Sequence, residues 1–264
     1  MLDSLAGDTV VWRHRLVAAT PRPDQGWDLT FHGGRRTNCD ILIGADGARS
    51  VVRSLLTDVG TSYVSTVVEL NVEDVDRRHP DLAELVGPGN LWCVGVNQIL
   101  SAQRLGDGGL RVGISLRAEG RPLDTYLDKR ALLDMFAGWN PRLTALIEAA
   151  DGTPTPRLIE AMPSGTRWTN RPGVTLIGDA AHLMPPVGEG ANQAMLDAAE
   201  LADHLAANPA DPGTAIRTYE ESMFTRIRPI AEMSARVQSM MLSPTASDDI
   251  VRFFSRTAEP ARTD

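Results

Sequence analysis

GVTLIGDAAHLMPPVGEGANQA, residues 173–194, is the most informative segment of this 264-residue chain for its fold. Residues 174–177, Val-Thr-Leu-Ile, are mostly apolar and partly β-branched, which predicts a strand buried on both faces. Gly178 ends this strand, and Asp179 follows at its carboxyl end, where open α/β sheets bind their ligands. The stretch therefore predicts an α/β fold with a ligand site directly after the strand.

The second half of the stretch predicts a glycine-rich loop that enters a helix near Ala191. Pro185 and Pro186 restrict the loop and remove two backbone donors, while Gly188 and Gly190 allow the backbone to approach a ligand closely. The first N–H groups of a helix have no partner inside it, and the helix dipole places positive charge there. We therefore expect this loop and helix end to bind a negatively charged group.

Hydrophobic patterns before this stretch predict a small set of strands and helices. Alternation through residues 10–20, a break at 21–26 and renewed alternation at 27–31 indicate a hairpin, which a strand at 40–44 and a helix at 49–56 follow. Three further strands are typical of an antiparallel sheet, and two helices follow them. The strands are expected at residues 91–96, 99–105 and 110–116, and the helices at 124–139 and 141–150.

After the stretch, the pattern is helical to the end of the chain. Residues 191–206 predict an Ala-rich helix, and residues 213–241 predict a long helix in which Pro229 introduces a kink. Residues 248–255 predict a last short helix. The chain is therefore expected to end in a group of helices.

The composition is ordinary for a globular protein. Hydrophobic residues make up 42% of the chain and charged residues 23%. A formal net charge of −8, with no basic run to offset it, argues against nucleic acid as a partner. No apolar run reaches the length of a membrane span, and the first residues do not read as a signal peptide. We expect a cytoplasmic protein without a membrane partner.

The two cysteines, Cys39 and Cys93, follow no spacing typical of a metal or redox site. In a reducing cytoplasm they are expected to be buried thiols without a disulfide. No metal site is therefore expected.

Two motifs resemble the fingerprints of a known family. GDAAHLMPP at residues 178–186, followed by GxGxN at 188–192, resembles the second flavin fingerprint of the class A FAD-dependent monooxygenases, which para-hydroxybenzoate hydroxylase typifies. CDILIGADGARSVVR at residues 39–53 is similar to the Asp-Gly fingerprint of that family. Within the family, HLMPP and the C-terminal helices most resemble the tetracycline-inactivating branch. The resemblance extends over nearly the whole chain.

The resemblance implies an α/β fold in which an incomplete FAD/NAD(P)-binding Rossmann-like domain is interleaved with an antiparallel-sheet substrate domain. The expected domains are residues 1–60 (part of the FAD-binding domain), 61–165 (substrate domain) and 166–264 (return to the FAD-binding domain, with C-terminal helices). The family opens with a strand–GxGxxG–helix unit for the adenosine half and pyrophosphate of FAD. This sequence contains no such motif. A separate N-terminal FAD-binding segment is therefore expected, in the same protein or as a partner chain.

The resemblance also implies which residues contact the cofactor. The Asp179 carboxylate accepts hydrogen bonds from sugar or ribityl hydroxyls, and the backbone at the helix end donates to the pyrimidine edge of the flavin. Asp46 and Arg53 lie near the pyrophosphate, although a structural Asp–Arg pair is the alternative. The implied cofactor-binding residues are Asp46, Gly47, Arg53, Gly178, Asp179, Pro185, Gly188, Gly190, Ala191 and Asn192.

Residues that contact the substrate carry a weaker signal. Gln103, Arg111 and Gly113 lie on candidate strands of the substrate domain, where a surface or core role is an equal alternative. Arg111 stands where the tetracycline-inactivating branch has a histidine. His182 is interpreted as structural, because a lone histidine is usually a satisfied hydrogen-bonding group and no nucleophile elbow accompanies it. No catalytic residue is assigned.

The activity implied by the resemblance is that of an oxidoreductase. NAD(P)H reduces FAD, and O₂ then supplies one oxygen atom to an aromatic or enolic small molecule, a polyketide-like compound among the options. Two alternatives remain open. The chain is an inactive remnant that acts as a small-molecule binding module, or it is a flavoprotein oxidoreductase that does not hydroxylate.

Overall fold

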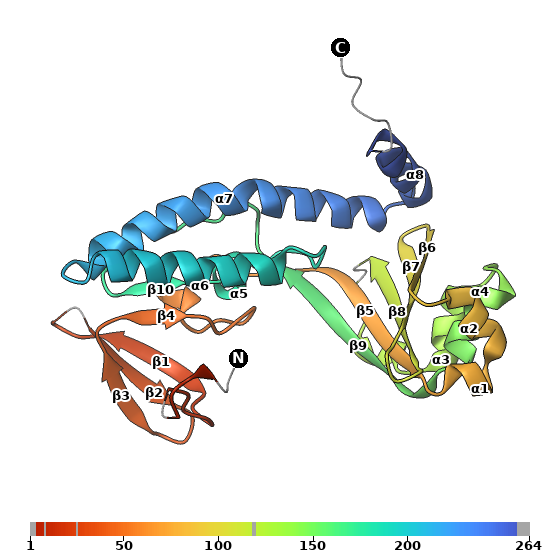
Figure 1. Ribbon diagram of the computed structural model, residues 1–264, viewed down its shortest axis with the longest axis horizontal. Helices are drawn as coiled ribbons and strands as arrows, with labels where there is room; N and C mark the ends of the chain where they lie inside the picture. Colours follow the sequence, from red (N-terminus) through yellow and green to blue (C-terminus); the bar gives the residue numbers. More distant parts are fainter. Residues whose placement is uncertain (1–3, 8, 25, 118–119, 258–264) are drawn as a thin grey trace, which may run out of the picture. The chain divides into compact units, whose positions relative to one another are not determined.

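The computed structural model describes residues 4–7, 9–24, 26–117 and 120–257 (Figure 1). The chain forms two compact units. The first unit comprises Met1–Thr61 and Met162–Glu232, and the second comprises Ser62–Ala161 and Met233–Asp264. Each unit has its own apolar core, so each is described by itself. The expected domain boundaries near residues 60 and 165 stay a prediction, as does the place of the last helices.

The first unit begins with a three-stranded antiparallel sheet. Strands β1 (Leu16–Pro21) and β2 (Trp27–Phe31) form the expected hairpin, with Pro21 opposite Trp27. The strand does not extend back over residues 10–14. A third strand, β3 (Arg36–Cys39), pairs with β2 and was missed because its sequence RTNC is polar and mostly exposed.

A second, parallel pair of strands lies in the core of the first unit. Strands β4 (Leu42–Gly44) and β10 (Val174–Leu176) pair with Leu42 opposite Val174, and all three residues of β10 are buried. Both predicted strands are thus confirmed. A Cβ on Gly44 would lie 2.6 Å from Leu176 Cδ2 and 2.7 Å from Val52 Cβ, so only glycine allows this packing.

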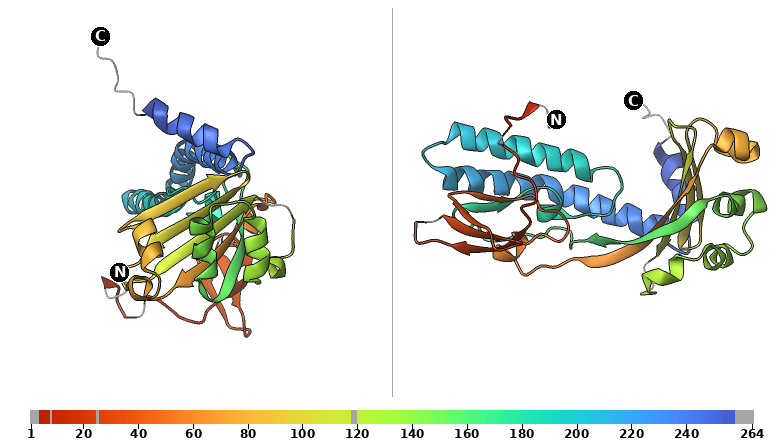
Figure 2. Two further views of the ribbon diagram at one scale, coloured as in Figure 1. Left: turned by 90° about the vertical axis from the view of Figure 1, so that its right-hand side faces the viewer. Right: turned by 90° about the horizontal axis from the view of Figure 1, so that it is seen from below.

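Three helices follow β10, and the first unit contains the first two of them and the third as far as Glu232. The short helix α5 (Asp179–His182) comes directly after the strand, and α6 (Gly190–Ala207) and α7 (Pro212–Met241) confirm the two long predicted helices. Helices α6 and α7 run side by side over this unit (Figures 1 and 2). Helix α7 continues through Pro229.

The helix predicted at residues 49–56 is wrong in length. Only a short 3-10 helix, η2 (Arg53–Leu55), forms there. The Asp46 carboxylate accepts hydrogen bonds from the Val51 and Val52 N–H groups at 2.7 and 3.3 Å. These bonds hold residues 46–52 as a turn, because a short polar side chain that bonds the nearby backbone competes with helix formation.

The second unit is built on a five-stranded antiparallel sheet. Its strands are β5 (Ser62–Val72), β6 (Asn90–Gly95), β7 (Gln98–Arg104), β8 (Leu110–Arg117) and β9 (Asp151–Ala161), in the order β6-β7-β8-β5-β9. The three predicted strands are confirmed as β6, β7 and β8. Strand β9 was missed because Pro154 and Pro156 interrupt it; it lies at the edge of the sheet, where proline is tolerated.

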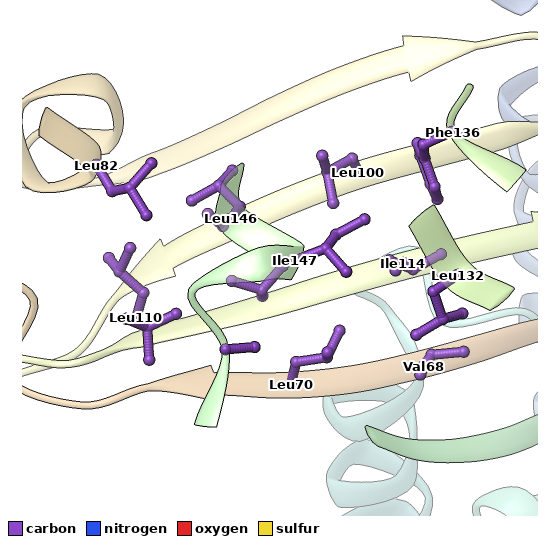
Figure 3. Packing of buried hydrophobic residues seen from close by; sticks show 14 of the residues in the cluster. Val68, Leu70, Leu82, Leu100, Leu110, Ile114, Leu132, Phe136, Leu146 and Ile147 are labelled. Carbon is purple, nitrogen blue, oxygen red and sulfur yellow. The ribbon is translucent and has the colours of Figure 1, made fainter. Parts of the chain in front are cut away.

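Helices cover one face of this sheet and form an apolar core with it (Figures 2 and 3). Leu132, Leu146 and Ile147 are fully buried and pack against Val68 and Leu100 of the sheet. These helices are α1 (Val75–Arg78), α2 (Pro80–Val86), η3 (Leu123–Tyr126), α3 (Lys129–Met135) and α4 (Pro141–Glu148), and α8 (Ala246–Thr257) belongs to the same unit.

The helix predicted at residues 124–139 is divided. Asp128 caps the start of α3 by accepting a hydrogen bond from the Arg130 N–H at 3.0 Å, so η3 and α3 are separate. Leu127, between them, is 45% exposed rather than part of the apolar face. The helix predicted from Pro141 is confirmed as α4, with proline in its first turn.

The overall class is as expected: α/β, with antiparallel sheets and C-terminal helices. Within the described part of the chain, no helix combines the length and the apolar character needed to span a membrane.

Candidate functional site

The candidate site starts at the turn after β10 in the first unit. Gly178 has φ of 57° and ψ of −141°, a backbone conformation that favours glycine. A Cβ at this position would also lie only 2.9 Å from the Ala194 Cβ of α6. The turn therefore packs directly against the start of α6, and glycine is required both for its conformation and for this contact.

Asp179 occupies the first position of α5 and is exposed. Its Oδ1 atom lies 3.9 Å from the position of a Cβ on Gly190, the first residue of α6. The fold thus brings the acidic end of the turn next to the start of α6. An ionised carboxylate there is an acceptor for ligand hydroxyls.

The start of α6 is open. Glu189 precedes the helix and is exposed, and no side chain caps the first turn by a hydrogen bond. Ala191 and Asn192 are exposed as well. Backbone donors at such an end attract negative charge, so the helix end is suited to an electron-rich group.

The loop between α5 and α6 is shaped by its prolines and glycine. Pro185 is buried whereas Pro186 is exposed. Gly188 has φ of 112°, and a Cβ there would meet nothing within 4 Å. Open space beside this glycine is compatible with a ligand passing close to the loop, the role predicted for Gly188.

Arg53 joins the second fingerprint to the first. It is 6% exposed, and its guanidinium donates to the carbonyls of Ala180 at 2.7 Å, Asp179 at 2.8 Å, Ala48 at 2.9 Å and Gly47 at 3.3 Å. The structure therefore brings the two fingerprints together through one buried cation.

Asp46 holds its own loop in place. Its carboxylate accepts hydrogen bonds from the Ser50 hydroxyl and from the N–H groups of Val51 and Val52. Ser50 also accepts from the Arg53 N–H at 2.9 Å. Within the described residues Asp46 and Arg53 thus have structural partners, and their contact with a cofactor stays a prediction.

Sequence reasoning missed the residue at the centre of the site, Asp197 of α6. It is fully buried, and its Oδ2 atom accepts from the Gly178 N–H at 2.7 Å and lies 2.6 Å from His182 Nε2. The structural interpretation of His182 therefore fits its surroundings: the ring is 7% exposed and bonded to Asp197.

Arg226 of α7 completes this cluster. Its guanidinium donates to Gln193 Oε1 at 2.5 Å, Asp197 Oδ1 at 2.8 Å and Glu200 Oε2 at 3.0 Å. The three acceptors follow a spacing of four and three residues along α6, which places them on one face of the helix. That polar stripe in an Ala-rich helix was the signal that sequence reasoning overlooked.

The charges in this cluster stabilise one another. Burial alone would raise the pKa of Asp197, but the hydrogen bonds from His182, Arg226 and Gly178 hold that pKa below its ordinary value. For Arg226, burial alone would lower the pKa, and the bonds to Asp197 and Glu200 raise it. Asp197 is therefore ionised in the folded protein at neutral pH.

A second buried carboxylate braces β10 from α7. Glu220 is 2% exposed and accepts from Trp168 Nε1 at 2.9 Å, Thr175 Oγ1 at 2.8 Å and Asn170 Nδ2 at 2.9 Å. The neighbouring Tyr219 donates its hydroxyl to a β10 carbonyl, and burial raises the pKa of this phenol. Strand β10 is thus fixed by polar contacts at its own residues.

The predicted substrate residues lie in the second unit, on the sheet. Gln103 of β7 pairs with Arg111 of β8, and Gly113 pairs with both Ser101 and Glu69. Arg111 is half-exposed and lies 3.7 Å from Glu69. The structure therefore brings these three residues onto one pair of neighbouring strands.

The two cysteines are half-buried rather than buried, which corrects the expectation. Both are free thiols, and burial is the main cause that raises the pKa of each. For Cys39 the negative charge of Asp40 adds to the effect.

Known proteins are similar to this chain in sequence and in fold. A family model described as FAD binding domain matches residues 143–233. The chain is 35% identical over 239 residues to the 3-amino-4-hydroxybenzoate 2-monooxygenase PtnB3 of Streptomyces platensis, an alignment that covers 89% of this chain and 59% of the relative. The chain thus spans about three fifths of the length of this relative.

Solved structures show the same fold. The crystal structure of Klebsiella pneumoniae HpxO complexed with FAD and uric acid matches with a TM-score of 0.75 at 24% identity, over 93% of this chain and 62% of that chain. The tetracycline destructase Tet(51) matches with a TM-score of 0.63 at 18% identity, over 95% of this chain and 68% of that chain. At these identities the likeness shows the fold alone.

Proposed function

We propose, because the chain belongs to the class A FAD-dependent monooxygenases, that the whole protein binds FAD and hydroxylates an aromatic small molecule with NAD(P)H and O₂. The observation that carries this proposal is the arrangement after β10. An exposed carboxylate, Asp179, lies beside the open start of α6. The sequence that builds it is the flavin fingerprint of the family.

The residues of the first unit fit the cofactor. A flavin offers hydroxyls on its ribityl chain and an electron-rich pyrimidine edge. Asp179 supplies an acceptor for the hydroxyls, and the first N–H groups of α6, at Gly190, Ala191 and Asn192, supply donors for the edge. Glycine at position 188 leaves space for a large ring system close to the backbone.

In this proposal the residues of this chain bind the flavin and orient its ring. Asp179 and the start of α6 hold the flavin, Pro185 flanks its ring, and Gly47 belongs to the loop that Arg53 holds beside α5. Bound flavin supplies the redox chemistry and the activation of O₂. Donors fixed in advance at the pyrimidine edge stabilise negative charge there without reorganisation.

We assign the substrate to the open face of the five-stranded sheet. Arg111, Gln103 and Gly113 lie there, and Glu69 lies within 4.0 Å of both Arg111 and Arg157. The guanidiniums are suited to an anionic or hydroxylated aromatic ring. The name of PtnB3, a 3-amino-4-hydroxybenzoate 2-monooxygenase, supports an aromatic substrate of this kind.

Two further parts of the proposal concern the missing part of the FAD site and the cellular location of the protein. The adenosine half of FAD requires a strand–GxGxxG–helix unit, which these 264 residues do not contain. We propose that it is supplied in the same protein or as a partner chain. We also place the protein in the cytoplasm, where NAD(P)H is available.

The test is turnover by the protein supplied with that unit, under ¹⁸O₂, with 3-amino-4-hydroxybenzoate as the probe. The proposal expects oxidation of NADPH or NADH coupled to a hydroxylated product that contains one ¹⁸O atom. Oxidation of the nicotinamide without a hydroxylated product would instead indicate a non-hydroxylating flavoprotein. Binding of the probe without any bound flavin would indicate a binding module.

A further inference from the structure

We propose that Asp197 is a positioning residue that holds the two halves of the flavin fingerprint in one geometry. The first half is the Gly178–Asp179 turn, and the second is the start of α6 at Gly190. The inference rests on the proposed function, because it concerns the same site. Asp197 lies in the middle of α6 and is fully buried, so it acts on the site through its neighbours and not by direct contact with a ligand.

The contacts of Asp197 reach the first half directly. Its Oδ2 atom accepts from the Gly178 N–H at 2.7 Å, and the same atom lies 2.6 Å from His182 Nε2 at the end of α5. Both ends of the Asp179–His182 helix are thus fixed by one carboxylate oxygen. Asp197 thereby fixes the position of Asp179, the first residue of α5, through the residues at both ends of that helix.

The second half is fixed through the other carboxylate oxygen. Asp197 Oδ1 accepts from Arg226, which also donates to Gln193, one turn nearer the start of α6. Gln193 in turn donates its backbone N–H to the Glu189 carbonyl at 3.0 Å, in the first turn of the helix. The chain of hydrogen bonds from Asp197 through Arg226 and Gln193 therefore reaches the start of α6, where the candidate flavin donors lie.

The charge of Asp197 is essential to this arrangement. An amide at this position keeps the size and one acceptor oxygen, but it directs an NH₂ group toward Arg226, or toward the Gly178 N–H and His182. One of these donors then loses its partner inside the protein, where an unpaired polar group is costly. The Gly178 turn and the start of α6 are then no longer held together.

Glu220 provides a matched control. It is also a buried carboxylate of the first unit, but its bonds go to Trp168, Asn170 and Thr175, which precede the fingerprint, and not to Gly178. The substitutions Asp197→Asn and Glu220→Gln therefore remove the same chemical group from the same core. Only the first removes it from the turn that carries Asp179.

The first measurement needs no cofactor. Amide hydrogen exchange is followed by mass spectrometry in the wild type and both variants at equal fractions folded. The proposal expects Asp197→Asn to accelerate exchange by about tenfold or more in both residues 178–183 and residues 190–194, and Glu220→Gln to accelerate it around residues 168–176. Equal acceleration of all three segments by both variants would overturn the proposal.

The second measurement uses the protein supplied with the strand–GxGxxG–helix unit, and it is affinity for FAD, read from flavin fluorescence, together with the visible spectrum of the bound flavin. Loss of one charge-assisted hydrogen bond at the turn predicts an affinity about tenfold lower in Asp197→Asn and a shifted spectrum. Glu220→Gln is expected to keep the wild-type spectrum and affinity within about threefold. If Asp197→Asn binds FAD as the wild type does, the positioning role is wrong while FAD binding stands. If no protein binds FAD, the proposed function fails, and the exchange experiment still decides the positioning role.

Discussion

The cores of the two units differ in kind. The second unit packs helices on a sheet through apolar side chains such as Leu100, Leu132 and Ile147. The first unit also has an apolar core, but it encloses charge. Among the described residues, all of the buried charged or imidazole side chains lie in the first unit: Arg53, His182, Asp197 and Glu220.

The second core therefore serves mainly to stabilise its unit, whereas the buried charges of the first core also fix the positions of particular atoms. Apolar contacts are non-directional, so they stabilise the second unit without aiming any atom. Buried hydrogen bonds of charged groups are directional, and breaking one of them is expensive. In the first unit, Arg53 and Asp197 direct such bonds at the backbone of the two fingerprints, at Gly47, Asp179 and Gly178, which is where the proposed cofactor contacts lie.

The largest expected effect comes from removing charge in the first unit. Asp197→Leu leaves Arg226, His182 and the Gly178 N–H without their shared partner. We expect a loss of about 3–5 kcal/mol in the free energy of unfolding, the range for one broken partner of a buried ion pair. Urea unfolding checks this. Asp203→Leu, an exposed position on the same helix, serves as control and is expected to change stability by about 0.5 kcal/mol or less.

The matching change in the second unit is Leu132→Ala. The side chain is fully buried between α3 and the sheet, so truncation leaves a cavity. A loss of about 3 kcal/mol is expected, with FAD affinity unchanged when folded protein is titrated. If Leu132→Ala lowered the affinity for FAD as much as Asp197→Asn does, the second core would also position the cofactor site, and the distinction between the two cores would be wrong.

A smaller effect is expected for Gly44→Ala at the β4–β10 pair. The added methyl group would lie 2.6–2.7 Å from Leu176 Cδ2 and Val52 Cβ, so the strands must separate. Overpacking of this kind costs about 1–3 kcal/mol. Gly106→Ala is the control, because a Cβ there meets nothing within 4 Å. Equal melting temperatures for the two variants would contradict the close packing of the strands.

The smallest expected effect is a dependence of the free energy of unfolding on pH in the acid range. The folded pKa of Asp197 lies below its ordinary value of 3.8, with burial opposed by hydrogen bonds from His182 and Arg226. Its ionised form therefore stabilises the fold above that value, and this contribution is lost as the pH falls through the lowered pKa. As the pH falls below 3.8, the wild type should therefore lose stability more steeply than Asp197→Asn. Parallel curves would contradict the ion pair.

The local patterns predicted much of the fold. The strand β10, the helices α6 and α7, and the three strands β6, β7 and β8 follow from hydrophobic periodicity over a few residues. Strand β5 was overlooked although its SYVSTVVELNV sequence is rich in β-branched residues. The helix expected at residues 49–56 failed because a side chain, Asp46, captured the backbone donors.

The candidate site was predictable only where its residues are close in sequence. Asp179 and the start of α6 share one motif, so their proximity followed from it. The contacts of Asp197 with Gly178 and Arg226 span 19 and 29 residues, and those of Arg53 with α5 span more than 120. Such contacts depend on how the elements pack, which no local pattern encodes.

The central claim is that the turn after β10 and the start of α6 bind FAD through Asp179. Its most direct test is a fluorescence titration with FAD of the folded protein supplied with the strand–GxGxxG–helix unit, comparing the wild type with Asp179→Ala and with the exposed control Asp203→Ala. We predict saturable quenching for the wild type and the control, and an affinity about tenfold lower for Asp179→Ala. Equal affinity in all three proteins, or no saturable binding by the folded wild type supplied with the strand–GxGxxG–helix unit, would contradict the account.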